Sequence, residues 1–142
     1  MWIRNRYTLK KIHAILLFMV TLITGLSLAQ RVEAREFKKH LHFARGTNRA
    51  TVTGDIVRGD QDIYFINVHS GQVMSIKISS LENNAVFEVL EPRVRGRKEE
   101  KDITGGADIT KWSGRLAKTG EYKIEVGGTR GNTSYTLQVS VK

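Results

Sequence analysis

Residues 121–139 read EYKIEVGGTRGNTSYTLQV, and this stretch decides the fold. Tyr122, Ile124 and Val126 alternate with polar residues before the glycines, and a second alternation begins at Tyr135. A period of two is typical of half-buried strands. A phosphate-binding loop would require a helix after its glycines, but a strand pattern follows them here. The stretch therefore predicts a β-hairpin with a glycine-rich turn at residues 127–132.

The predicted turn carries one charged residue, Arg130. We expect Gly127, Gly128 and Gly131 to supply its positive φ angles, because glycine has no Cβ that would clash there. Arg130 then stands at the tip of the hairpin, either as a solvated surface charge or as a contact for a partner. The residues alone allow both interpretations.

Alternation with the same period occurs in three earlier segments: Tyr64, Ile66 and Val68; Met74, Ile76 and Ile78; and Ala85, Phe87 and Val89. The polar residues between the apolar ones, Lys77, Glu88, Lys123, Glu125, Gln138 and Ser140, are expected to face water. Phe87, Tyr122 and Leu137 are expected to lie in the core.

The remaining segments complete a regular series of short strands. Residues 49–56 and 109–116 have the β-branched content of strands, and residues 41–43 are a shorter candidate. Turn-forming residues separate the segments. Seven or eight short strands with this spacing indicate an all-β protein, a single antiparallel β-sandwich. Residues 91–109 contain the sole proline and a dense mixture of charges, so a long exposed loop is expected there.

The chain begins with a basic flank followed by an apolar run. Residues 1–11 carry four basic and no acidic residues, and residues 12–29 are mostly apolar. This order is typical of a secretory signal peptide, with cleavage expected after Ala29 or Ala34. We therefore expect an exported protein, periplasmic or extracellular, with no stable membrane span after cleavage. The expected parts are a signal peptide at 1–29, a charged flexible leader at 30–40 and a β-sandwich domain at 41–142.

Composition narrows the range of partners. From Gln30 onward the chain has 19 Lys and Arg residues (23 minus 4) against 14 Asp and Glu residues, a net charge of +5. Nucleic-acid-binding proteins cluster such charge among stacking aromatic residues, and this pattern is missing from the sequence, so no nucleic-acid partner is predicted. A mild attraction to acidic partners is expected instead. The absence of cysteine excludes disulfides and thiolate metal sites.

Pairs of titratable residues suggest little chemistry. His40 and His42 would share one face of a strand, but a metal site needs further ligands, and no third residue has a suitable spacing. Asp60 and Asp62 precede a strand and are expected to cap backbone amides. These patterns predict no metal, no cofactor and no catalytic residue, so the chain is expected not to be an enzyme.

The order of the segments is similar to that of a known family. From Phe43 to Val141 the chain resembles β-sandwiches related to the bacterial pre-peptidase C-terminal domain, and above all the secreted or periplasmic bacterial inhibitors of invertebrate-type and goose-type lysozymes. The shared features are the strand start at Asp62–Tyr64, Gly71 with Gln72, Asn84–Phe87, Gly114 with Leu116, Gly120 with Tyr122, and Tyr135 with Leu137. Most of these are turn and core residues, so the resemblance implies a fold more directly than an activity.

In those inhibitors a Ser-Gly-x-x-Tyr element on a loop enters the lysozyme cleft. Alignment through WSGRL, residues 112–116, places residues 108–112 at that element, where only the terminal aromatic is retained, as Trp112. The resemblance thus implies a partner-binding surface that includes Asp108, Lys111 and Trp112, together with Thr129 and Arg130. Basic residues on such a surface would suit a cleft lined by carboxylates.

Two functions from different classes are therefore predicted. The first is an exported non-catalytic module that inhibits a lysozyme-class glycosidase by inserting loops into its cleft. The alternative is an envelope polysaccharide-binding or structural β-sandwich without inhibitory activity. An inhibitor is expected to bind tightly through loop tips, whereas a glycan-binding module is expected to bind weakly through exposed aromatic residues.

We predict that the exported protein begins at Gln30 or Arg35, because small residues precede both cleavage positions. N-terminal sequencing of the exported protein checks this. An intact Met1 on membrane-bound protein would contradict it.

Overall fold

The computed structural model describes residues 35–96 and 100–142; the predicted signal peptide and the residues Ala29 and Ala34 lie outside them. The described residues form eight strands: β1 (Glu36–His40), β2 (Arg49–Ile56), β3 (Gln61–Val68), β4 (Val73–Ser80), β5 (Ala85–Leu90), β6 (Lys111–Arg115), β7 (Gly120–Gly128) and β8 (Thr133–Val141). No helix within the described ranges is long and apolar enough to cross a membrane.

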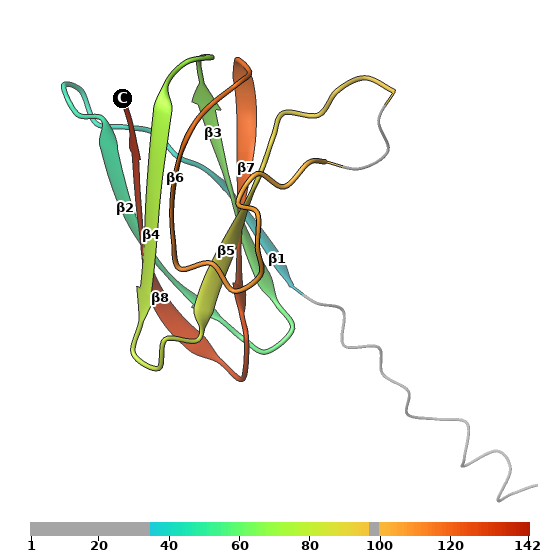
Figure 1. Ribbon diagram of the computed structural model, residues 1–142. Coiled ribbons are helices and arrows are strands. Elements are labelled where there is room, and N and C mark those ends of the chain that lie inside the picture. The colour runs from blue at the N-terminus through green and yellow to red at the C-terminus, as the bar shows by residue number, and fades with distance from the viewer. Residues whose placement is uncertain (1–34, 97–99) are drawn as a thin grey trace, which may run out of the picture. The chain divides into compact units, whose positions relative to one another are not determined.

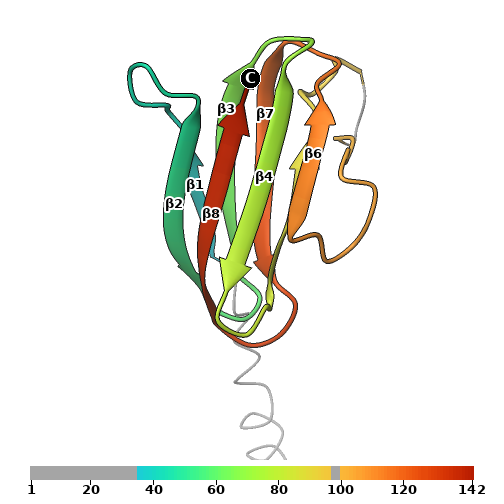
Figure 2. The same ribbon diagram turned by 60° about the vertical axis from the view of Figure 1, so that its left-hand side comes forward.

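Consecutive strands always lie in different sheets. The odd-numbered strands form one four-stranded sheet in the order β1-β3-β7-β5, and the even-numbered strands form the other in the order β2-β8-β4-β6. Figures 1 and 2 show these sheets packed face to face. Neighbouring strands are antiparallel except for the parallel pair β1 and β3. The prediction of an all-β sandwich with seven or eight strands is confirmed, and every connection between its strands crosses from one sheet to the other.

The predicted hairpin at residues 121–139 is wrong in its pairing. β7 pairs with β3 and β5, whereas β8 pairs with β2 and β4. The glycine-rich connection is therefore a crossover between the sheets rather than a hairpin turn. Alternation reports which face of a strand is buried, but two alternating strands can bury those faces either side by side or across the core. Sequence pattern alone does not distinguish these arrangements.

The core lies between the two sheets and consists of the alternating residues that the sequence indicates. Tyr122 and Ile124 of β7 and Leu137 of β8 are completely buried, and Phe87 of β5 is 3% exposed. All of them belong to one continuous apolar cluster. The predicted core positions are therefore confirmed.

The sandwich begins earlier than the sequence indicates. Residues 36–40, expected to be part of a flexible leader, form β1 and pair with Gln61–Phe65 of β3. All five residues of β1 are exposed, so the strand has no apolar period that would reveal it. Backbone hydrogen bonds, which do not depend on the side chain, join it to the sheet. Residues 41–43 are not a strand but a connection in which Leu41 is buried.

Three buried polar side chains are joined by hydrogen bonds at one margin of the core. The Tyr135 hydroxyl donates to Asp62 Oδ2 (2.5 Å) and lies 2.6 Å from the Tyr64 hydroxyl. Burial, followed by these hydrogen bonds, raises the pKa of Tyr135. Asp62 is only 8% exposed, so its expected role as a backbone cap is wrong. Asp60 does accept a hydrogen bond from the backbone N–H of Arg35 (2.8 Å).

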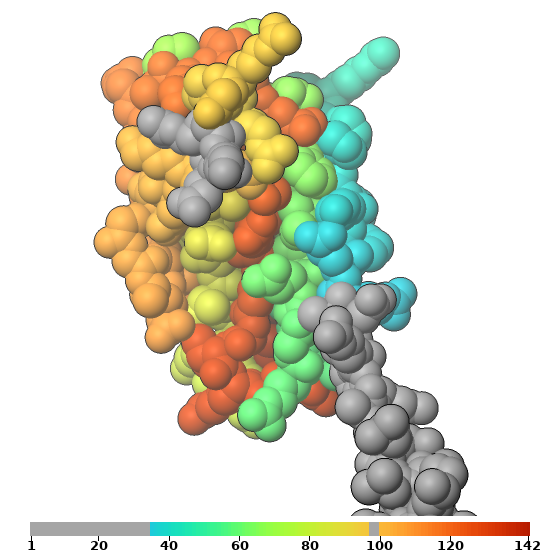
Figure 3. Space-filling view, turned by 90° about the vertical axis from the view of Figure 1, so that its right-hand side faces the viewer, coloured from blue at the N-terminus to red at the C-terminus, as the bar shows by residue number. Residues whose placement is uncertain are grey.

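The long connection between β5 and β6 lies against β5 (Figure 3). The N–H of Ile103 donates to the carbonyl of Val89, and the N–H of Phe87 donates to the carbonyl of Ile109, each over 2.9 Å. Ile103 and Ile109 also pack against the core cluster. The described part of this loop therefore continues the hydrogen bonding of the sheet beyond its β5 edge.

This loop also changes the environment of the charges on the outer face of the β1-β3-β7-β5 sheet. Lys123 forms an ion pair with Glu100 of the loop and another with Glu125 (2.6 Å), and all three side chains are only 15–24% exposed. Glu88 lies opposite Glu125 in the strand register. Partial burial, together with the neighbouring Glu125 carboxylate, raises the pKa of Glu88 to about 7. The expectation that Glu88, Lys123 and Glu125 face open water is therefore wrong.

We predict that Glu88→Gln stabilises the fold in neutral and alkaline solution only. Because the folded-state pKa of Glu88 is raised from 4.5 to about 7, the fold favours the protonated carboxyl. That stability is present below pH 4.5 and is lost as the pH rises through about 7. Glutamine stays neutral throughout, so the variant should melt at a higher temperature than the parent above pH 7 and at a similar temperature near pH 4.

Thermal melts across this pH range check the prediction. Glu82→Gln removes the same charge from an exposed turn and serves as the control, with no pH-dependent difference expected. Parallel pH profiles for the Glu88→Gln variant and the parent would contradict the argument.

Candidate functional site

Three crossovers meet at one end of the sandwich, which we call the loop end: residues 57–60, 81–84 and 129–132. Figure 1 shows them together at the lower end of the strands. Hydrogen bonds join them: the N–H of Arg58 donates to Asn132 Oδ1 (3.0 Å), and Asn84 Nδ2 donates to the Arg130 carbonyl (3.0 Å). These residues come from connections far apart in the sequence, so the loop end exists only in the folded chain.

Asn84 holds the loop end together from the inside. Its side chain is 2% exposed, donates to the carbonyls of Arg130 and Asn132 (3.0 and 3.3 Å) and accepts from Thr133 Oγ1 (2.7 Å). The backbone carbonyl of Asn84 accepts a further hydrogen bond from the N–H of Thr129 (2.8 Å). Buried amide groups are costly unless paired, and here both ends of the amide are paired. In the sequence, only the family resemblance points to this residue.

The glycines of the β7–β8 connection contribute less than expected. Gly131 has a φ of +58°, but Gly127 and Gly128 do not have positive φ angles and lie within β7. The expectation that all three supply left-handed backbone is therefore wrong for two of them. β7 extends through both glycines because Gly127 and Gly128 pair with Val86 and Ala85 of β5.

Arg130 and Thr129 have different positions in this connection. The Thr129 side chain points toward Asn84, and its hydroxyl donates a hydrogen bond to the Asn84 backbone carbonyl (3.4 Å). Arg130 is exposed, and its guanidinium Nη2 reaches the carbonyl of Glu82 (3.4 Å) on the neighbouring crossover. The guanidinium group thus lies at the surface of the loop end, while the Arg130 backbone is fixed by its hydrogen bond to the buried Asn84 side chain.

Asp108, Lys111 and Trp112 lie on a different part of the molecule. Lys111 and Trp112 begin β6, where they pair with Lys77 and Ile76 of β4. Trp112 is half-buried, packs at the margin of the core and lies over Gly114, where a Cβ would be 2.4 Å from its ring. Asp108 is exposed and has a φ of +57°.

The structure therefore separates the expected site residues into two groups. Thr129 and Arg130 belong to the loop end, while Asp108, Lys111 and Trp112 belong to β6 and the segment before it. Among the described residues, no hydrogen bond or ion pair joins the groups. The segment carrying Asp108 does pair with the strands that enter and leave the 81–84 crossover, since the N–H of Ile78 donates to the Thr110 carbonyl (2.9 Å).

The loop end combines basic and apolar surface. Val57 is 57% exposed and Leu81 is 99% exposed, and they adjoin Arg58 and Glu82 in the sequence. Exposed apolar side chains beside arginine are typical of protein interfaces, whereas catalysis requires converging titratable groups. No set of three or more His, Asp or Glu side chains within the described ranges is placed to hold a metal ion. The loop end therefore has the character of a binding surface.

We predict that Asn84→Ala destabilises the fold by roughly 1–3 kcal/mol, because it leaves the Thr133 hydroxyl and two carbonyls without their buried partner. Chemical denaturation measures the effect. Asn67→Ala makes the same change at an exposed strand position and should cost no more than about 0.5 kcal/mol. Equal costs for the two variants would show that Asn84 does not hold the crossovers together.

Comparisons with known proteins agree with this fold. No protein-family model matches the chain, and no curated protein matches its sequence. Among solved structures, PliG of Aeromonas hydrophila, a periplasmic inhibitor of g-type lysozyme, is 25% identical with a TM-score of 0.67 over 78% of this chain and 100% of that one. PliG of Salmonella Typhimurium is 22% identical with a TM-score of 0.58 over 75% of this chain and 98% of that one.

A mutant PliG of Escherichia coli is also 22% identical, with a TM-score of 0.58 over 77% of this chain and its own full length. All three solved proteins are periplasmic inhibitors of g-type lysozyme. The likeness agrees with the family resemblance that the sequence indicates. The chain has the β-sandwich fold of the periplasmic inhibitors of g-type lysozyme.

Proposed function

We propose that this protein is an exported, non-catalytic binding module that inhibits a lysozyme by inserting its loop end into the catalytic cleft. The observation that carries the proposal is the likeness to Aeromonas hydrophila PliG, which extends over the whole of that inhibitor at 25% identity. A g-type lysozyme is accordingly the first partner to test. The inhibitors' periplasmic location supports export of this chain to the same compartment.

The geometry of the loop end supports insertion into a cleft. Its crossovers are braced by Asn84, so little conformational freedom is lost when they bind. Arg130 and Arg58 offer positive charge, and Leu81 offers apolar surface. Glycosidases cleave with a pair of carboxyl groups on either side of the bond, so a lysozyme cleft presents negative charge to an inserted arginine. Complementary charge of this kind fixes orientation and speeds association.

Lys111, Trp112 and Asp108 form the second part of the proposed interface. They occupy the positions that align with the inhibitory element of the family, although the serine and glycine of that element are absent from this chain. Lys111 is exposed, and Trp112 keeps part of its indole accessible at the sandwich margin. In this proposal the lysine contributes charge and the tryptophan contributes apolar contact at the side of the cleft. Thr129 acts within the chain by holding the turn that carries Arg130.

Inhibition assays test the proposal directly. The purified protein is titrated into g-type, invertebrate-type and chicken-type lysozymes while their activity on bacterial cell walls is followed. We expect stoichiometric inhibition of at least one enzyme, with g-type lysozyme inhibited most strongly. Full activity of all three enzymes in excess protein, together with binding to isolated peptidoglycan, would contradict inhibition and support a polysaccharide-binding module.

We predict that Arg130→Ala weakens lysozyme binding by about 2–5 kcal/mol if its guanidinium is buried against a carboxylate in the complex. The melting temperature of the free protein should hardly change, because a surface substitution usually alters stability by no more than about 0.5 kcal/mol. Isothermal calorimetry and thermal melts measure the two effects.

Arg45→Ala is the matched control, since Arg45 is exposed on the connection that enters β2 from the end opposite to residues 57–60. It should leave binding unchanged. If the Arg130→Ala variant inhibits as strongly as the Arg45→Ala variant, Arg130 is not part of the interface.

A further inference from the structure

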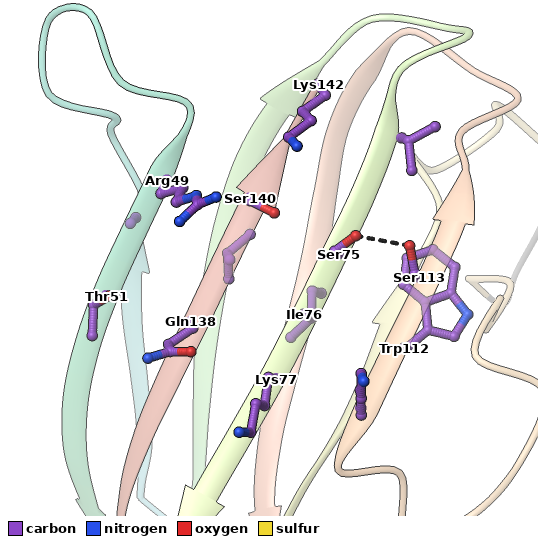
Figure 4. A pocket seen from close by; sticks show the side chains of 14 residues that line it. Arg49, Thr51, Ser75, Ile76, Lys77, Trp112, Ser113, Gln138, Ser140 and Lys142 are labelled. Atoms are coloured by element: carbon purple, nitrogen blue, oxygen red, sulfur yellow. Dashed lines mark hydrogen bonds between the residues drawn. The ribbon is translucent and has the colours of Figure 1, made fainter.

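The outer face of the β2-β8-β4-β6 sheet carries basic side chains around a floor of hydroxyl groups. We call it the basic face. Its side chains lie in two rows across the strands: Arg49, Ser140, Ser75 and Ser113 in one, and Thr51, Gln138, Lys77 and Lys111 in the other. A shallow hollow of about 520 Å³ runs over it. Figure 2 shows this sheet, and Figure 4 shows the hollow with Arg49, Gln138 and Lys77 on three neighbouring strands.

The floor of the hollow consists of short polar side chains. Ser75 and Ser113 share a hydrogen bond (2.7 Å), drawn in Figure 4, and Ser140 lies beside Ser75 in the register. Neighbouring strands lie about 4.8 Å apart, so each row is a regular line of hydrogen-bonding groups about 14 Å long. Three of the four side chains in the first row are serines, whereas the second row carries the longer Gln138, Lys77 and Lys111.

The described part of the chain does not neutralise the positive charges of this face. Among the described residues, Arg49, Lys77 and Lys111 take part in no ion pair. Within residues 35–96 and 100–142, no acidic residue lines the hollow. Asp55, at the far end of β2, is held by the Ser134 hydroxyl (2.5 Å) and lies about 20 Å along the strand from Arg49.

Lys77 and Lys111 are direct cross-strand partners on β4 and β6. Such partners have Cβ atoms about 5 Å apart, and like charges in this position destabilise a sheet. The pairing therefore costs stability in the free protein. An anion bound across β4 and β6 would neutralise both ammonium groups.

We propose that the basic face binds a linear acidic polysaccharide whose carboxylates pair with Arg49, Lys77 and Lys111. The hydroxyls of Ser75, Ser113 and Ser140 and the amide of Gln138 then pair with sugar hydroxyls. A chain of uronate residues carries a carboxylate beside neutral hydroxyls on every sugar, so it offers partners to both the charged and the neutral polar groups of the face. The basic face differs from the loop end, which lies beyond the ends of β2 and β4, and it shares only its margin at Lys111 and Trp112 with the proposed lysozyme interface.

Other acidic partners fit this surface less well. The large apolar residues with marked exposure among the described residues are Phe37, Val57, Leu81 and Val94, and none of them lines the hollow, so nothing there would insert into a lipid bilayer. Single-stranded nucleic acids bind on exposed aromatic platforms. Trp112, the aromatic residue at the hollow, faces the core side of β6 and covers Gly114 instead.

Binding of polygalacturonate to the purified full chain tests the proposal, with neutral dextran, an oligothymidylate and vesicles of anionic phospholipid as the competing probes. We expect saturable binding of polygalacturonate that weakens as salt rises. The double variant Arg49→Gln/Lys77→Gln should bind about tenfold more weakly, since each exposed ion pair contributes up to roughly 1 kcal/mol and 1.4 kcal/mol corresponds to a factor of ten.

The double variant Arg95→Gln/Lys101→Gln is the matched control. It removes the same charge from exposed positions of the long loop, so its affinity should equal that of the parent. If both double variants weaken polygalacturonate binding equally, the net charge of the protein explains the binding, and the proposal is overturned. Tighter binding of the oligonucleotide or the vesicles than of polygalacturonate would overturn it as well.

A second readout separates this proposal from a folding defect. Lys77→Gln relieves the repulsion from Lys111, so the free variant should melt about 1–5 °C higher than the parent while binding polygalacturonate more weakly. Lysozyme inhibition should be retained in Arg49→Gln/Lys77→Gln, so the two functions can fail independently. A Lys77→Gln variant with reduced stability or unchanged polygalacturonate affinity would contradict the assignment.

Discussion

The alternation of consecutive strands between two sheets is the constraint on which the rest of this structure depends. Every strand except the exposed β1 buries one face, wholly or in part, against the opposite sheet, and each strand is followed in the sequence by a strand of that opposite sheet. Every connection must then span the distance between packed sheets, about 10 Å. Connections of this kind are arches rather than tight turns, and at one end three of them meet to form the loop end. The surface proposed to enter a lysozyme is thus a direct product of the strand order.

Arches across a sandwich leave polar backbone groups near the core, and the buried polar side chains satisfy them. Asn84 pairs with the carbonyls of Arg130 and Asn132 and with the Thr133 hydroxyl. No buried side-chain polar atom within the described residues lacks a hydrogen-bond partner. A fully paired network of this kind specifies one geometry, because any displacement would leave a buried group unpaired. Rigidity at the loop end favours recognition of a preformed cleft.

The same architecture separates two surfaces with different chemistry. The loop end combines Arg130 and Arg58 with exposed Leu81, whereas the basic face is a shallow hollow rich in hydroxyl groups. One suits a concave protein partner and the other suits an extended polar chain. The two proposed sites meet only at Lys111 and Trp112, so Arg49 and Lys77 would still be able to hold an acidic glycan while a lysozyme occupies the loop end. Such an arrangement would place an inhibitor where the enzyme meets its envelope substrate.

By itself, the sequence determined the class of fold and the composition of the core. A period of two in segments such as Tyr122–Val126 and Tyr135–Val141 reports burial of one face, and burial is a local property of each strand. The residue types also indicated the family resemblance that the likeness to PliG supports. Alternation does not reveal the strand Glu36–His40, because it pairs with β3 through its backbone while all five of its residues are exposed.

Only the tertiary structure decided which strands are neighbours, because alternation is equally compatible with a hairpin and with packing across a core. Because β7 and β8 lie in different sheets, the glycine-rich stretch is a crossover and not a hairpin tip, and hydrogen bonds from Asn84 fix its backbone. The tertiary structure also brought Glu100 over Lys123 and aligned Lys77 with Lys111. Each of these contacts joins segments far apart in the chain, and charge placement of this kind depends on strand order rather than on local pattern.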